Sequence, residues 1–417
     1  MSTAYDFLVG TFNTPQLFIL RFTPPSPTNS GQGTLDILHR ASAIGSHSWL
    51  HLIPPRRSGV RNLYATAWTE PPTVVAYAVH SPTDIELLGS APTRSRSGYV
   101  TASDIALYSA GGATGEVFSL DPETGNIISP NSSSGRAPAA DHISSGVPPL
   151  QLLSFLDEDA QRDDGSVMDF GGLRHGAHST DLSPDGKALY IADIGRNCIW
   201  TFSIDQKSGE LALGEKHISP RPTDGPRHVW PHPSGKFVYC LQEHTSMVDV
   251  FSTSNDGVVL KHEQGVRIIP AEENEGDYWA DEVRTSLSDG DRPRYLYAST
   301  RGLKKGKNGW VAVYKLTDEG TIDTSLAPHA SFSKDESSSK ADSAPYNGLL
   351  HLWETPTSGG WANAIQPGPT HEGVEYLALT DSEQGFVFVL SWDGMEIKEV
   401  ARTRLDEGVG AATAVWL

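Results

Sequence analysis

The sequence predicts an all-β chain that folds as a seven-bladed β-propeller with four strands in each blade. Glycine and proline are abundant, at 40 and 28 of 417 residues, which is typical of many short strands joined by tight turns. One strand–turn–strand unit recurs about seven times, mostly at intervals of about 40 to 60 residues, which is the spacing of propeller blades. The last residues of the chain also look like the strand that the first unit lacks.

Two segments show the repeated unit most clearly. They are "HSTDLSPDGKALYIADIGRNCIWTFSID", residues 178–205, and "RHVWPHPSGKFVYCLQEHTSMVDVFSTS", residues 227–254. Each consists of a strand, a turn of the type S-P-D-G or H-P-S-G, a second strand, a polar loop and a third strand. Proline presets φ, Asp or Ser bonds the nearby backbone, and glycine tolerates a left-handed conformation, so the turn is specified locally. The other copies are expected at residues 5–23, 60–80, 104–122, 294–317 and 374–393.

The two ends of the chain are expected to share a blade. The first copy begins at the N-terminus with "YDFLVG" and lacks an innermost strand, and "GVGAATAVWL", residues 408–417, has the composition of that strand. We therefore expect the C-terminal strand to join the N-terminal blade and close the ring, which leaves no free edge between the blades.

The whole chain, residues 1–417, is expected to form a single propeller domain. Two longer gaps between copies, residues 129–172 and 331–347, are predicted to be loop insertions. Within the first gap, "LLSFLDED" is predicted to form a short helix.

Composition excludes several classes of partner. The formal net charge is −19 without a segregated basic patch, which argues against binding to nucleic acid or to an anionic membrane. No apolar run approaches membrane-spanning length, and the two cysteines, Cys198 and Cys240, have no metal-site spacing, which suits a reducing, cytoplasmic location. We expect a small-molecule substrate and no cofactor or metal. The sequence pattern gives no indication of the oligomeric state.

Residues at two kinds of position are expected to meet at one face of the ring. At entry positions the chain leads into the innermost strand of a blade, and at exit positions it leaves the second strand. The entry positions hold Ser48, His178, Arg227, Asp281 or Glu282, Asn363 and Thr413, and the exit positions hold Thr11, Asp193, Glu243, Arg301 and Asp381. Two arginines, a glutamate and a histidine converging on one channel mouth predict a catalytic site there.

Structural roles are the alternative for several of these residues. Asp193 and Asp381 each follow a strand and precede a turn, where an Asp carboxylate often only accepts bonds from nearby backbone N–H groups. His178 also suits a satisfied core histidine, and Arg227 with Glu243 suits a salt bridge that orders one hairpin.

Four stretches resemble the fungal carboxy-cis,cis-muconate cyclases, which belong to the lactonase-like seven-bladed propellers. They are "GAHSTDLSPDGKALYIAD", "DGPRHVWPHPSGKFVYCLQE", "YLYASTR" and "TPTSGGWANAI". The resemblance implies a cofactor-free, metal-free cyclase that closes a lactone ring on a conjugated diene acid. It also implies catalytic roles for His178, Arg227, Glu243 and Arg301. The predicted substrate-binding residues are Ser48, Trp49, Asp193, Glu282, Trp361, Asn363, Asp381 and Thr413.

The chain departs from that family pattern at three places. Trp361 stands where the family has His, Thr413 stands where it has Asn, and "GSAPTRSRSGY" replaces a basic stretch. Fewer anion-binding groups and one more aromatic ring suggest a larger, less charged substrate. The sequence therefore slightly favours a cyclase of secondary metabolism that performs a hetero-Diels–Alder closure of a quinone methide with an alkene. The alternatives are a 3-carboxy-cis,cis-muconate cycloisomerase, a lactonase and a non-catalytic binding propeller.

Overall fold

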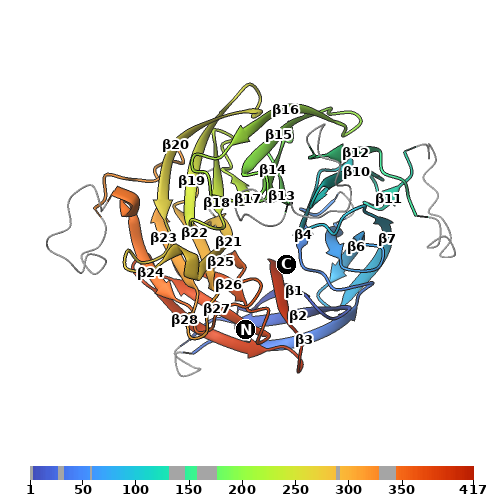
Figure 1. The fold of residues 1–417 in the computed structure, drawn as a ribbon. Helices are drawn as coiled ribbons and strands as arrows, with labels where there is room; N and C mark the ends of the chain where they lie inside the picture. The colour runs from blue at the N-terminus through green and yellow to red at the C-terminus, as the bar shows by residue number, and fades with distance from the viewer. Residues whose placement is uncertain are drawn as a thin grey trace.

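The computed structural model confirms the all-β seven-bladed propeller and describes residues 3–26, 32–56, 59–130, 146–156, 176–287, 292–327 and 344–417. Seven antiparallel sheets surround a central channel, with the first strand of each blade near the centre and the last at the rim (Figure 1). Six of the described sheets are four-stranded antiparallel meanders, and the third blade has five strands because β11 and β12 both pair with β10.

The first blade combines the two ends of the chain. Its strands, from the centre outward, are β29 Ala411–Trp416, β1 Tyr5–Thr11, β2 Gln16–Thr23 and β3 Thr34–Ser42. Strand β29 pairs with β1 through Phe7↔Trp416 and Val9↔Ala414, and the Phe7 and Trp416 ring centroids lie 4.5 Å apart. The predicted closure of the ring by the C-terminal strand is therefore confirmed.

The next three blades follow in chain order. The second contains β4 Leu50–Leu52, β5 Arg61–Ala67, β6 Thr73–Ser81 and β7 Asp84–Pro92. The third contains β8 Tyr99–Ala102, β9 Ala106–Gly111, β10 Thr114–Leu120, β11 Ile127–Ile128 and β12 Gln151–Ser154. The fourth contains β13 Ala177–Leu182, β14 Ala188–Asp193, β15 Cys198–Ile204 and β16 Leu211–Ile218.

The last three blades complete the ring. The fifth contains β17 Pro226–Pro231, β18 Phe237–Gln242, β19 Met247–Ser254 and β20 Val259–Arg267. The sixth contains β21 Tyr278–Thr285, β22 Tyr295–Gly302, β23 Trp310–Lys315 and β24 Leu349–Glu354, with 3-10 helices η3 Glu275–Asp277 and η5 Ala344–Tyr346 beside it. The seventh contains β25 Ile365–His371, β26 Val374–Thr380, β27 Phe386–Trp392 and β28 Ile397–Arg404.

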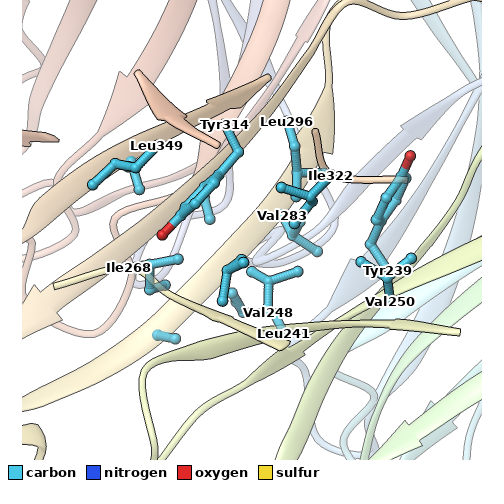
Figure 2. Packing of buried hydrophobic residues seen from close by; sticks show 14 of the residues in the cluster. Tyr239, Leu241, Val248, Val250, Ile268, Val283, Leu296, Tyr314, Ile322 and Leu349 are labelled. Atoms are coloured by element: carbon cyan, nitrogen blue, oxygen red, sulfur yellow. The ribbon is translucent and has the colours of Figure 1, made fainter. Parts of the chain in front are cut away.

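Apolar side chains between neighbouring blades form the core. Figure 2 shows the cluster between the fifth and sixth blades, where Tyr239, Leu241 and Val250 face Val283 and Leu296. Each is fully buried, and complete burial of such a side chain contributes about 1.5 to 3 kcal/mol. The apolar residues that alternate along the strands thus pack neighbouring sheets against each other.

The repeated turns have the predicted chemistry. Gly186 and Gly235 occupy the same place in two hairpins and adopt φ of +68° and +69°, a left-handed conformation that favours glycine. In the first of these turns Ser183 donates to Asp185, and the Asp185 carboxylate accepts from the backbone N–H of Lys187. Local side-chain bonds therefore stabilise the turns between the inner strands.

The helix predicted at "LLSFLDED" is wrong. Strand β12 begins at Gln151 and pairs antiparallel with β10 through Val117↔Gln151 and Thr114↔Ser154. The two-residue strand β11 pairs only with the C-terminal end of β10, so the rest of that edge needs another partner. Most of the predicted loop 129–172, and residues 331–343 of the second, lie outside the described residues. No helix in the described ranges is long and apolar enough to cross a membrane.

Candidate active site

A cavity of about 830 Å³ opens where innermost strands begin and second strands end. Its lining includes most of the residues predicted for the site: Ser48, Trp49, His178, Arg227, Glu282, Arg301, Trp361 and Thr413. The entry positions of several blades therefore do converge, as the propeller geometry predicts.

Two arginines and two carboxylates form an alternating ionic network on one wall of this cavity. Arg227 Nη1 lies 2.7 Å from Glu243 Oε1, and Arg227 Nη2 lies 3.2 Å from Asp281 Oδ1. Arg301 completes the network at 3.4 Å from Glu243 and 3.6 Å from Asp281. Burial opposes the charge on Arg227, but Asp281 and Glu243 outweigh it and raise its pKa, so this guanidinium stays charged.

Glu243 lies behind the arginines and does not line the cavity. Its side chain is fully buried, and it contacts Arg227 and Arg301, which both do line the cavity. This position does not support direct proton transfer by Glu243 to a molecule in the cavity. It suits a positioning residue that orients two guanidiniums and balances their charge.

Glu282, predicted as a substrate-binding residue, has the environment of a general acid. Its Oε2 accepts a bond of 3.2 Å from the Tyr99 hydroxyl, and its Oε1 lies 2.8 Å from Arg284 Nη2 and 3.1 Å from His228 Nδ1. Burial raises the pKa of Glu282 to about 7, against the lowering effects of Arg284, Arg227 and Tyr99. A carboxyl group that lines the cavity is therefore protonated in a large share of molecules near neutral pH.

A second ionisable pair lies behind Glu282. His228 Nε2 lies 3.4 Å from Asp181 Oδ2, and both side chains are buried. Burial lowers the pKa of His228 and raises that of Asp181, so both favour their neutral forms. The uncharged imidazole leaves Arg284 as the main cation beside Glu282.

Aromatic rings form a further wall of the cavity. Trp49 stacks on Tyr99 with centroids 3.6 Å apart and planes 29° apart, and Tyr99 lies 5.1 Å from the His178 ring. The Trp49 indole N–H donates to the Val100 carbonyl, and Ser48 shares a hydrogen bond of 2.9 Å with Thr66. This wall offers a flat, apolar face to a conjugated molecule.

Three predicted substrate-binding residues do not line the cavity. Asp193 is fully buried and accepts from Arg196 Nη1 at 2.8 Å and from Trp200 Nε1 at 3.0 Å. Asp381 accepts from two backbone N–H groups in the following turn. Asn363 donates its backbone N–H to Asp281 and its side-chain amide to the Thr300 carbonyl. These three side chains therefore lie in the walls behind the lining, where each bonds protein groups, and their position does not support the predicted contact with a substrate.

Several cavity residues were not predicted, although the entry and exit rule applies to them. Arg94, Arg96 and Tyr99 lead into β8, and Trp68 follows β5; all four line the cavity. The Arg96 guanidinium lies 4.9 Å from the centroid of the Trp68 ring. The sequence pattern indicates no entry position for the third blade, because "GSAPTRSRSGY" departs from the family pattern there.

A family model described as "Lactonase, 7-bladed beta-propeller" matches residues 162–328. A protein named Muconate cycloisomerase 1 from Cutaneotrichosporon cutaneum is 36% identical over 425 residues, covering 100% of this chain and 99% of the relative. The chain belongs to the carboxymuconate cyclase-like family. Another family relative, the Carboxy-cis,cis-muconate cyclase of Neurospora crassa, is 30% identical over 249 residues, covering 58% of this chain and 60% of the relative.

Solved structures agree on the fold of this family member. The periplasmic gluconolactonase PpgL of Pseudomonas aeruginosa superposes with a TM-score of 0.70 at 15% identity and covers 100% of this chain and 99% of its own. A putative 6-phosphogluconolactonase from Bacteroides fragilis gives 0.69 at 19% identity, covering 99% and 98%. At this identity the two matches bear on the fold alone, whereas the full-length relative makes the chain an enzyme of the cyclase kind.

Proposed function

We propose that this protein is a cofactor-independent lactonising cyclase that acts on a conjugated dienoic acid carrying at least two carboxylates. The main support for this proposal is that four arginines line one cavity. Arg227 and Arg301 are held by Glu243 and Asp281, whereas Arg94 and Arg96 are exposed and have no carboxylate of the described residues at ion-pair distance. The second pair therefore offers charge to an anion that enters from solvent. The names of the two family relatives support a muconate-type acid.

The reaction is an isomerisation in which no atom is lost. One carboxylate oxygen of the diene acid bonds to the carbon γ to its carboxyl group and closes a five-membered lactone ring. The electron pair of the attacked double bond moves to the next carbon and spreads into the second carboxyl group as an enolate. That carbon then takes one proton, and the enzyme recovers it from water before the next turnover.

The cavity residues suit these steps. Arg227 and Arg301 lie side by side and can donate to the carboxyl group in which negative charge develops, and such preorganised donors are a major source of catalysis. Glu282 supplies the proton, since it lines the cavity and its pKa of about 7 allows a protonated form. The wall formed by Trp49 and Tyr99 holds the diene in the curled conformation that ring closure requires.

The first test is turnover of cis,cis-muconate and 3-carboxy-cis,cis-muconate by the full chain. We expect loss of the diene absorbance and the appearance of a lactone by NMR for at least one acid. If neither acid gives a lactone at high enzyme concentration, the proposal is overturned.

The second test assigns the proton donor through Glu282→Gln. We expect kcat to fall by about 10² to 10⁴, the usual contribution of a general acid. Because the protonated form is the active one, wild-type kcat should fall as pH rises through about 7, and this decline should be absent from the residual activity of the variant.

Glu375→Gln is the matched control for that variant. Glu375 is also buried and also accepts from a tyrosine, Tyr297, and from an arginine, Arg294, but it does not line the cavity. Its replacement should leave kcat and the pH profile unchanged. Equal effects of the two substitutions would remove the assignment of Glu282.

One observation favours a second candidate, the hetero-Diels–Alder cyclase. The cavity volume of about 830 Å³ lies toward the upper end of the range for drug-sized ligands, which is roughly 300 to 1,000 Å³, and a six-carbon diacid fills only part of it. In this reaction Arg227 and His178 would donate hydrogen bonds to the heterodiene oxygen. The test is to generate an ortho-quinone methide in solution together with an alkene partner, with and without the enzyme. If the product forms at the same rate and with the same stereochemistry in both cases, this candidate is excluded.

A further inference from the structure

A second hollow of about 580 Å³ adjoins the active-site cavity. The two share six lining residues: Phe12, Trp68, Arg96, Leu303, Gly360 and Trp361. We infer that this outer hollow is a subsite for an apolar substituent of the substrate, aromatic or branched, whose carboxylates lie among the arginines of the inner cavity. The inference rests on the proposed function and specifies the substrate class of that site.

Trp361 forms one side of the outer hollow and is unusual for a tryptophan. Its side chain is 70% exposed, although burying an aromatic ring removes about 150 to 250 Å² of surface from water. An apolar ligand in the hollow would cover this ring and remove part of its surface from water, which favours binding.

The backbone beneath Trp361 is held firmly. Gly359 and Gly360 adopt φ of +85° and +69°, and a Cβ on Gly360 would lie 2.6 Å from Cβ of Glu383. The Ser382 hydroxyl accepts from the backbone N–H groups of Trp361 and Ala362 and donates to the Gly359 carbonyl. An exposed indole on a backbone fixed in this way is preorganised to contact a ligand.

Two aromatic rings, one with a guanidinium over it, also line the hollow. The Phe12 and Trp68 centroids lie 5.4 Å apart at 64°, and the Arg96 guanidinium lies 4.9 Å from the Trp68 centroid. Leu303, which lines both spaces, is 41% exposed. Arg96 and these apolar side chains line both spaces, so positive charge and apolar surface meet where the outer hollow opens from the cavity. The residues that line the outer hollow alone are polar or glycine: Asn13, Gly302, Ser358, Ser382 and Glu383. A ligand with an anionic and an apolar end complements the shared part of the lining.

The test compares two dienoic acids that differ only in one substituent, 3-methyl-cis,cis-muconate and 3-phenyl-cis,cis-muconate. We expect the phenyl acid to have at least about tenfold higher kcat/KM, through a lower KM, which is the gain from about 1.4 kcal/mol of binding. Trp361→Ala should reduce kcat/KM for the phenyl acid about tenfold more than for the methyl acid. Met395→Ala is the control, because Met395 is 80% exposed and lines neither space, and it should reduce neither value.

The outcomes separate this inference from the proposed function. Equal kcat/KM for the two acids, or equal losses in Trp361→Ala, would overturn the subsite while leaving the lactonising activity standing. If neither acid forms a lactone, the proposed function fails, and equilibrium binding of both acids, measured by calorimetry, decides the subsite. Tighter binding of the phenyl acid that is lost in Trp361→Ala supports it, and equal binding of both acids overturns it.

Discussion

The hairpins β13–β14 and β17–β18 are built in nearly the same way but place different side chains at the cavity. Their turns, S-P-D-G-K and H-P-S-G-K, align without a gap, and Asn197 and Ser246 occupy equivalent places, both with φ of +50°. At the entry position His178 of the first hairpin corresponds to Arg227 of the second, and both line the cavity. The hairpins diverge at the exit position.

A shift of one residue separates their acidic groups. Aligned through the turns, Asp193 corresponds to Gln242, whereas Glu243 corresponds to the buried apolar residue Ile194. Asp193 bonds Trp200 on the neighbouring strand, and Gln242 bonds Asp249 at the equivalent place. Because successive residues of a strand point to opposite sides, one step moves a carboxylate from within its blade to the arginines of the cavity.

The largest effect is expected from removing the arginine of each buried ion pair. Arg227→Met should lower kcat/KM by about 10² to 10³, the usual cost of losing a donor to developing charge. Arg196→Met breaks the pair with Asp193 and should lower the free energy of unfolding by about 3 kcal/mol without changing kcat/KM. Steady-state kinetics and urea unfolding of both variants measure the contrast. A comparable loss of activity in Arg196→Met would show that the two hairpins do not differ as described.

A smaller effect is expected from neutralising the carboxylates. Glu243→Gln keeps the size of the side chain but removes the charge shared by Arg227 and Arg301, and should lower kcat/KM by about 10- to 100-fold. Asp193→Asn should leave kcat/KM within about twofold and act only on stability. Kinetics on the same substrate check both. Unchanged activity in Glu243→Gln would contradict the positioning role.

The smallest effect is expected at Asp381, an exit position whose carboxylate caps a turn. Asp381→Ala removes acceptors for the N–H groups of Glu383 and Gln384 and should lower the free energy of unfolding by about 1 kcal/mol. Activity should stay at the wild-type level, since Asp381 does not line the cavity. Thermal unfolding and kinetics check this result, and a loss of activity at unchanged stability would restore Asp381 as a substrate contact.

Local sequence patterns suffice to predict the seven blades, the pairing of consecutive strands in most of them, the closure by the last strand and the meeting of His178, Arg227 and Arg301. These follow from local causes: turn chemistry sets each hairpin, alternation sets each inward face, and a propeller places equivalent positions of all blades together. Arg96 and Tyr99 of the third blade obey the same rule, although they are not among the predicted site residues.

Contacts between blades, which no local pattern reports, set which carboxylates reach the cavity and in which direction their pKa values shift. Glu243 lies behind two arginines, Glu282 faces the cavity with a pKa of about 7, and Asp193 is held within its own blade. Burial and the charges of other blades set these properties, and both depend on contacts between residues far apart in sequence, such as the 183-residue separation of Tyr99 and Glu282. The strand pairing of Gln151–Ser154 is also non-local, because the open edge of β10 formed the partner that the segment itself does not specify.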